Sequence, residues 1–397
     1  MATVDPISEV STSSARLGPG LMVLLAAMPP ERLKGALDNL TAAFPAEGLL
    51  IASPDTLPQD TYPSLRIVSV PASNAWTLTA ADFVHAYQLA EKNEARVILM
   101  LGPGSLVPSS SELRDLANAV LTGSTDLAVP FYDLPPHAAL VNSAILYPLT
   151  RALFASRVRF PLAVDLGLSL RMAERLAGAA QHFTSNNQGA TPLWPINEAA
   201  VAGFAIDQFG FGPHIQSQPT GPDLNTIFPL VTEALFSDID AKAAFWQRFR
   251  PLPPVRNSMP MPQAPFSEAA AEIVSMHQAF KLAYTNLQEI WSLVLPPNSL
   301  LGLMRLAATD AAAFRMSDKL WARIVYDFLL AYRLRTINRG HLLGSLIPLY
   351  LAWVASHINL AASGTHPEDH IEAVAAAFEA DKPYLVSRWR WPDRFNP

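Results

Sequence analysis

The feature that most constrains the fold is an alternation of apolar runs with amphipathic segments over residues 18–131. Short, nearly uninterrupted apolar runs, such as residues 21–27 and 96–101, are typical of strands that are covered on both faces. Between such runs, residues 29–44 and 79–93 repeat apolar side chains at the spacing of one helix face. Further runs of the strand type are residues 48–53, 65–70 and 126–131. This succession predicts an α/β fold with a mostly parallel sheet and helices on both of its faces.

Changes in composition suggest how the chain is divided. Half of the 397 residues are hydrophobic and 16% are charged, which is enough apolar side chain for a large core. Residues 250–265 are rich in proline, and beyond them the periodicity is helical, most clearly over residues 317–335, with Ser317 as the cap. We therefore expect four segments: a flexible N-terminus over residues 1–17, the α/β domain over 18–250, a proline-rich linker over 251–265 and a helical domain over 266–397.

Charge and cysteine content exclude several classes of function. The net charge is −6 and no basic run occurs, which argues against a nucleic-acid partner. The absence of cysteine excludes disulfides, thiolate metal sites and cysteine nucleophiles. The N-terminus has no basic segment followed by an apolar one, so we expect no signal peptide and a cytoplasmic protein.

The longest apolar stretch, residues 341–362, is long enough to cross a bilayer. Polar residues and a proline interrupt it, among them His341, Pro348 and His357. We therefore expect a buried pair of helices here and no membrane span.

The end of the apolar run at residues 96–101 is a position where α/β folds commonly bind ligands. Gly102, Pro103 and Gly104 follow it, and none of them carries a charge. A helix is expected next, with Ser109 or one of the two serines after it as the N-cap. A site for a charged ligand would be expected to place acidic or basic side chains at this strand end, and this sequence has none there.

Several stretches of the sequence resemble one family of enzymes. The longest is LYPLTRALFASRVRFPLAVDLGLS at residues 146–169, and a second is GFAIDQFGFGPH at residues 203–214. Three more lie in the predicted helical part, at residues 320–332, 342–356 and 378–391. Together they resemble prokaryotic GT-A glycosyltransferases of the mannosylglycerate synthase and glucosyl-3-phosphoglycerate synthase type.

This resemblance implies a nucleotide-binding GT-A domain followed by a helical domain. It also implies transfer of a sugar from a nucleotide-sugar to a small acceptor, with Mg²⁺ or Mn²⁺ to offset the charge on the leaving diphosphate. Such enzymes usually hold the cation with an Asp-x-Asp at the end of the fourth strand, because hard cations prefer carboxylate oxygens. In this chain the motif falls on Gly102, Pro103 and Gly104, where no carboxylate remains.

The donor side departs from the family at two more places. The turn that contacts the nucleotide corresponds to the segment that begins at Ser53, and Ser53 and Asp55 are its candidate binding residues. The family's basic loop falls near residues 73–76, which contain no cation.

The acceptor side is altered as well. The acceptor loop corresponds to residues 132–142, which are one residue shorter than in the family and lack its arginine and aspartate. Its two ends, Tyr132 and Asn142, are candidates for lining the former acceptor site. Arg157 and Arg159 could bind a carboxylate or phosphate, or could equally be surface or interface cations.

Two residues survive where the family has catalytic or metal-binding groups. Asp165 could orient an acceptor hydroxyl or cap the helix that follows it. His214 aligns with the family's metal histidine, and it could bind a metal or diphosphate or be retained for packing. One histidine with at most one aspartate cannot hold Mg²⁺ or Mn²⁺ tightly, so no cofactor is expected unless the protein is active.

His366 and His370 lie four residues apart in HPEDHIE, a spacing that can bind zinc on a helix. No third ligand is evident in the sequence. The simpler interpretation is an exposed, acidic first turn of a helix that begins near Pro367.

The family's motif residues are missing at several positions of one pocket, while the stretches that form the scaffold are intact. This pattern favours a glycosyltransferase-family protein with a degenerate donor and metal site. Such a protein would be a pseudoenzyme with a structural or regulatory role. Its expected partners are a further copy of the chain, an active paralogue or a nucleotide-sugar. The alternative is an active glycosyltransferase that binds its nucleotide-sugar without the standard metal motif. A third hypothesis is a non-catalytic binder of a small polar ligand in the old pocket.

Overall fold

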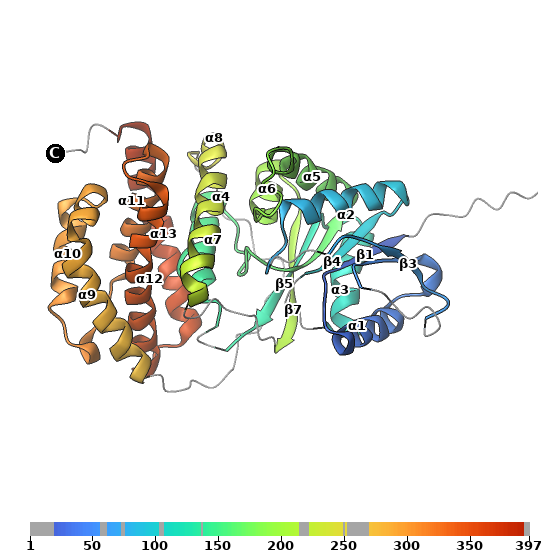
Figure 1. The fold of residues 1–397 in the computed structure, drawn as a ribbon, viewed down its shortest axis with the longest axis horizontal. Coiled ribbons are helices and arrows are strands. Elements are labelled where there is room, and N and C mark those ends of the chain that lie inside the picture. Colours follow the sequence, from blue (N-terminus) through green and yellow to red (C-terminus); the bar gives the residue numbers. More distant parts are fainter. Residues whose placement is uncertain are drawn as a thin grey trace, which may run out of the picture.

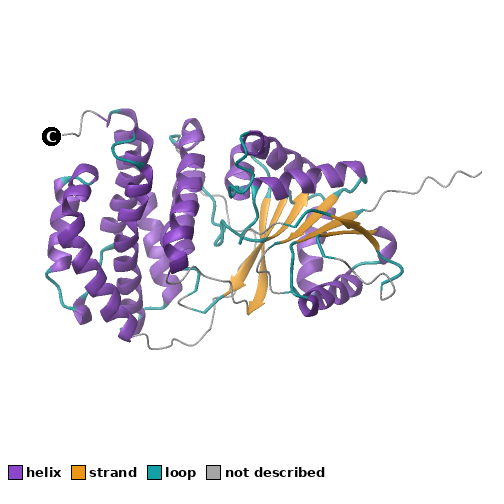
Figure 2. Cartoon of the chain, in the orientation of Figure 1, coloured by secondary structure: helices purple, strands orange, loops and turns teal. Residues whose placement is uncertain are grey.

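The computed structural model describes residues 20–55, 62–72, 76–102, 107–135, 138–213, 222–248, 251 and 270–392. Two parts lie side by side, a sheet covered by helices and a bundle of long helices (Figure 1, Figure 2). The predicted fold class is confirmed in the described residues, because the sheet is mostly parallel and the C-terminal part is helical.

Seven strands form one mixed sheet in the order β3-β2-β1-β4-β6-β5-β7. Their bounds are β1 Leu21–Leu25, β2 Leu49–Ser53, β3 Arg66–Ser69, β4 Val97–Leu101, β5 Leu127–Asp133, β6 Asp165–Ser169 and β7 Ile206–Pro213. β6 runs antiparallel to its neighbours β4 and β5, and the other pairs are parallel. The carboxyl ends of β1, β2 and β4 therefore meet beside the amino end of β6.

Helices cover both faces of this sheet, as the alternation predicts. Their bounds are α1 Pro30–Ala43, α2 Ala80–Lys92, α3 Ser110–Leu121, α5 Leu170–Ser185 and α6 Pro195–Ala202, with a short 3₁₀ turn at Ala46–Gly48. α1 packs beside α3 on one face, and α2 packs beside α5 on the other (Figure 1). Ser109 caps α3, since its hydroxyl accepts from the Glu112 N–H while the Glu112 carboxylate accepts from the Ser109 N–H.

Two strands were not predicted from the sequence. β6 contains Gly167, where a Cβ would lie 2.7 Å from the carbonyl oxygen of Leu116 in α3. β7 contains Gly210, Gly212 and a proline. Glycine and proline weaken the strand signal, so the pairing of these segments with β4 and β5 depends on tertiary contacts.

The helical part includes a segment from the middle of the chain. Its helices are α4 Tyr147–Phe154, α7 Pro222–Ala241, α8 Ala243–Trp246, α9 Ala270–Val294, α10 Pro297–Ala307, α11 Asp318–Leu334, α12 Arg339–Ala362 and α13 Pro367–Arg390, with a π-helical turn at Asn142–Leu146 and a 3₁₀ turn at Ala311–Ala313. α4 and α7 share one hydrophobic core with the C-terminal helices, and the sheet has a core of its own. The linker predicted at residues 251–265 stays a prediction, because all of it except Pro251 lies outside the described residues.

The apolar stretch that ends at Ala362 forms one continuous helix, α12, so the predicted pair of helices is wrong. Pro348 sits inside this helix. α12 is long and apolar enough to cross a membrane by length and composition, but 78% of its most apolar window is buried inside the protein. It packs against α7, α9, α11 and α13, which explains its apolar character on all sides.

Candidate functional site

The strand end that the resemblance assigns to the metal motif lies where it is predicted, directly after the central strand β4. The Gly102 N–H donates to the carbonyl oxygen of Val164 at 2.9 Å. A Cβ at Gly102 would lie 2.6 Å from that oxygen and 3.1 Å from a methyl carbon of Leu78. This position therefore carries no carboxylate and has no space for one. Pro103 and Gly104 lie outside the described residues.

Ser53 and Asp55, the donor-side candidates, hold the backbone of this edge. Ser53 ends β2 and is buried, and its hydroxyl accepts from the Asp55 N–H at 3.2 Å. The Asp55 carboxylate accepts from the Met28 N–H at 3.2 Å. Both polar groups thus bind main chain that follows β1 and β2.

A small cavity of about 20 Å³ lies beside these strand ends, enough for about one water molecule. It is lined mainly by apolar residues: Leu24, Leu25, Ala26, Pro54, Val70, Pro71, Leu78 and Leu101, with Asp82 and His85. The Asp82 carboxylate caps α2 by accepting from the N–H and hydroxyl of Thr79 at 2.8 and 2.7 Å. Among the residues that the structure describes, no lysine or arginine lines this cavity.

Asp165 is the first residue of β6 and lies opposite Leu101 of β4, the residue before Gly102. It is fully buried, and its carboxylate accepts from the Tyr132 hydroxyl at 2.8 Å. Burial, together with the Asp165 charge, raises the pKa of Tyr132 well above its usual value. The capping interpretation of Asp165 is wrong, because Ser169 caps α5 through its hydroxyl.

His214 lies outside the described residues, so its role stays a prediction. Within the described ranges, no three histidine, aspartate or glutamate side chains are grouped so that they could hold a metal ion.

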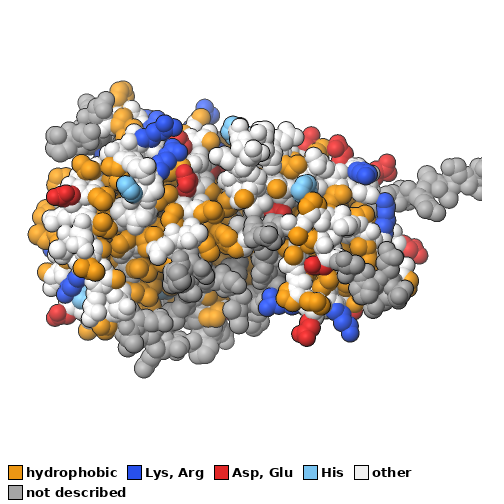
Figure 3. Space-filling view, in the orientation of Figure 1, with side chains coloured by type: hydrophobic (Ala, Val, Ile, Leu, Met, Phe, Trp, Pro, Cys, Tyr) orange, Lys and Arg blue, Asp and Glu red, His pale blue; other side chains and the backbone are white. Residues whose placement is uncertain are grey.

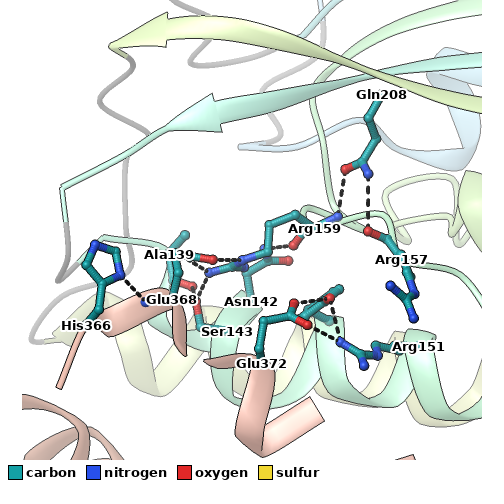
Figure 4. A network of polar contacts seen from close by, with 11 residues as sticks. Ala139, Asn142, Ser143, Arg151, Arg157, Arg159, Gln208, His366, Glu368 and Glu372 are labelled. Carbon is teal, nitrogen blue, oxygen red and sulfur yellow. Dashed lines mark hydrogen bonds and ion pairs between the residues drawn. The ribbon is translucent and has the colours of Figure 1, made fainter. Parts of the chain in front are cut away.

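The two candidate arginines differ in environment (Figure 4). Arg157 is exposed, and its carbonyl accepts from the Gln208 side-chain amide at 3.2 Å. Arg159 is buried, with its guanidinium carbon 5.3 Å from the ring centre of Tyr147 and 4.9 Å from that of Phe160. Its carbonyl accepts from the side-chain amide of Asn142 at 2.9 Å.

Arg159 binds a carboxylate that sequence analysis did not connect with it. Its Nε and Nη2 donate to Oε2 and Oε1 of Glu368 in α13 at 2.9 and 3.0 Å, and Nη2 also donates to the Ser143 hydroxyl at 2.9 Å. Of the two roles left open for Arg159, this contact matches the interface cation. Glu368 is 209 residues away in sequence, so only its acidic position in the first turn of a predicted helix could have suggested a cationic partner.

A second ion pair lies one turn further along α13. Glu372 accepts from the Tyr147 hydroxyl and from Nη1 of Arg151, both at 2.5 Å, and Nη2 of Arg151 lies 3.0 Å from Glu379. Burial alone would raise the pKa of Glu372, but Tyr147 and Arg151 outweigh it and lower the pKa below its usual value. The LYPLTRALF stretch therefore holds α13 in place. We call the pairs Arg159–Glu368 and Arg151–Glu372 the α13 junction.

His366 and His370 make separate contacts. His366 caps α13, and its Nδ1 accepts from the Glu368 N–H at 3.3 Å. His370 is buried, which corrects the expectation of an exposed first turn at this position. Its Nδ1 lies 2.7 Å from Nδ1 of His357, and its Nε2 lies 3.1 Å from a carboxylate oxygen of Asp318.

A pocket of about 30 Å³ lies at the Arg159–Glu368 pair, with room for one or two water molecules. Its lining residues are Tyr132, Leu134, Pro135, Ala138, Ser143, Arg159, Phe160, His366, Pro367, Glu368 and Ile371. The structure thus brings Tyr132 and Arg159 together at one pocket and places Arg157 on the surface. Ser143, His366 and Glu368 were not among the residues predicted for ligand binding.

No protein-family model matches the chain, and no curated protein matches it. Solved structures similar to it include glucosyl-3-phosphoglycerate synthase from Mycobacterium tuberculosis in complex with phosphoglyceric acid, at 14% identity, covering 56% of this chain and 80% of that chain, with a TM-score of 0.37. A complex of that enzyme with Mn²⁺, UDP-glucose and phosphoglyceric acid gives 15% identity, 56% and 79% coverage and a TM-score of 0.37. Its complex with UDP is 15% identical and covers 60% of this chain and 86% of that chain, with a TM-score of 0.36. At these values the likeness does not place the chain in that enzyme's family.

Proposed function

We propose that this chain is a glycosyltransferase-like protein whose donor and metal site is degenerate, and that it acts as a pseudoenzyme in a structural or regulatory role. The observation that carries the proposal is the crowding at Gly102. Gly102 is the position expected to hold the first metal carboxylate. Its N–H donates to the Val164 carbonyl oxygen at 2.9 Å, and the backbone there leaves no space for a Cβ.

The surroundings of Gly102 support the same proposal. A divalent cation needs several oxygen ligands that are free to turn toward it. Here Asp55 and Asp82 accept hydrogen bonds from backbone N–H groups, and Asp165 accepts one from the Tyr132 hydroxyl. The apolar lining of the strand-end cavity also offers little to a diphosphate.

A regulatory role needs a partner, which we propose to be a second copy of the chain or an active paralogue. Exposed apolar side chains on the outer helices support this part. Leu282 and Leu293 of α9 are 65% and 62% exposed, and Met304 of α10 is 48% exposed. Hydrophobic side chains are spread over the helical part of the face in Figure 3.

The test is calorimetric titration of the chain with UDP-glucose, with and without Mn²⁺, combined with an assay of sugar transfer to small acceptors. We expect no Mn²⁺-dependent binding at sub-millimolar concentration and no transfer. Tight binding that a chelator abolishes would instead support the alternative, an active glycosyltransferase that transfers a sugar to a small acceptor through a non-standard metal site.

A further inference from the structure

The Arg159–Glu368 pair joins a buried cation to a carboxylate from a distant part of the chain (Figure 4). The guanidinium presents two parallel N–H groups to two carboxylate oxygens, at 2.9 and 3.0 Å. This two-pronged geometry is the one with which arginine binds any carboxylate, whether it belongs to a side chain or to a small molecule. Both residues line the same pocket.

The Arg159 side chain is more constrained by its surroundings than the Glu368 side chain. The Arg159 side chain is 6% exposed, lies against the rings of Tyr147 and Phe160, and is also bonded to Ser143. The Glu368 side chain is 19% exposed, and in the part of the chain that the structure describes its carboxylate accepts hydrogen bonds only from Arg159. Arg159 is fixed by packing and by the Ser143 hydrogen bond, whereas the Glu368 side chain is the more exposed of the two and has one hydrogen-bonding partner within the described residues. Glu368 is therefore the partner that is more easily exchanged.

Unused hydrogen-bonding capacity remains next to this pair. Nη1 of Arg159 and Oδ1 of Asn142 are fully buried, and neither has a hydrogen-bond partner within the described ranges. An unsatisfied buried donor is costly, particularly on a charged group, so a water molecule or ligand that reached Nη1 would gain stability. The pocket also lies at the N-terminus of α13, where the helix dipole favours negative charge.

We propose that Glu368 is an internal stand-in for a small carboxylate ligand, and that such a ligand binds Arg159 by displacing it. Binding would exchange one carboxylate for another on the Nε and Nη2 donors of Arg159 and release the first turn of α13 from the sheet part. The pair is thereby a latch between the two parts of the molecule that a small anion opens. This inference concerns the pocket at α13 and is independent of the donor site at Gly102.

The experiment uses acetate as the probe and acetamide as its uncharged isostere, with binding followed by NMR titration of the full chain without metal or nucleotide. Glu368→Gln removes the competing charge, so it should bind acetate roughly tenfold more tightly than the unmodified chain, the scale of one charge-assisted hydrogen bond. Glu372→Gln is the matched control, since it weakens the other pair of the α13 junction and does not line the pocket. It should bind acetate as the unmodified chain does.

Two further measurements keep the proposal open to refutation. In the unmodified chain, acetate should speed amide hydrogen exchange at residues 367–370, and acetamide should not. Adding Arg159→Lys to Glu368→Gln should abolish the gain, because lysine keeps the charge but lacks the two-pronged fork. If Glu368→Gln fails to fold, Glu368→Asp, whose arm is one carbon shorter, should give an intermediate gain. Equal acetate affinity in the glutamine variants at 368 and 372, or equal binding of acetamide, would overturn the proposal.

Discussion

The strand ends at Gly102 and the α13 junction are both places where this fold could bind a charged ligand, yet they differ in chemistry. At the strand ends the cavity lining is mainly apolar, and the carboxylates of Asp55 and Asp82 accept hydrogen bonds from backbone N–H groups. At the junction, arginines and glutamates form paired, partly buried contacts between α13 and the segment around α4. The stretch that most resembles an enzyme family is therefore the one that binds α13, and its polar groups lie where they stabilise the structure.

The largest expected effect comes from placing a carboxylate at the strand ends, by Gly102→Asp. The new Cβ would lie 2.6 Å from the Val164 carbonyl oxygen and 2.9 Å from the Val164 Cβ, so backbone must shift. We expect a loss of about 3 kcal/mol in the free energy of unfolding, or failure to fold. Urea unfolding measures this loss.

The matched control for that substitution is Gly178→Ala in α5. A Cβ there meets nothing within 4 Å, so stability should be unchanged or slightly higher. A Gly102→Asp variant as stable as the unmodified chain, with a melting temperature raised by Mn²⁺, would erase the contrast between the strand ends and the junction.

A smaller effect is expected from Arg151→Leu in the junction. It removes the cation that binds Tyr147, Glu372 and Glu379, and should cost about 2 kcal/mol, the scale of hydrogen bonds to a charged group. Arg157→Leu is the surface control and should stay within about 0.5 kcal/mol. Equal losses in the two variants, measured by urea unfolding, would mean that the junction contributes no specific stability.

The smallest effect concerns the pH dependence of Glu372. Its pKa is lowered in the folded chain, so its contribution to stability is present above its unfolded pKa and is lost as the pH falls through the folded value. Glu372 is half exposed, so Glu372→Gln should cost about 1 kcal/mol or less at pH 7. The difference from the unmodified chain should shrink below the usual glutamate pKa. A difference that stays constant, or grows, down to pH 3 would show that the pair does not lower this pKa.

The sequence by itself determined the first five strands, the helices between them and the helical character of the C-terminal part. These elements carry their signal locally, in apolar periodicity and in caps such as Ser109 and Ser317, whose hydroxyls accept hydrogen bonds from the backbone N–H groups of Glu112 and Leu320. The position of Gly102 at the end of a central strand was also predictable, because strand ends are visible as the ends of apolar runs.

Tertiary structure alone decided the rest. β6 and β7 both contain glycine, which weakens their strand signal, and they become strands because β4 and β5 offer free edges to pair with. Asp165 was expected to cap a helix or act in a site, and its hydrogen bond to Tyr132 depends on the antiparallel course of β6. Glu368 meets Arg159 across 209 residues of chain. Such partners leave no local pattern in the sequence. The packing of the two hydrophobic cores brings them together, and nothing in the sequence near either residue signals it.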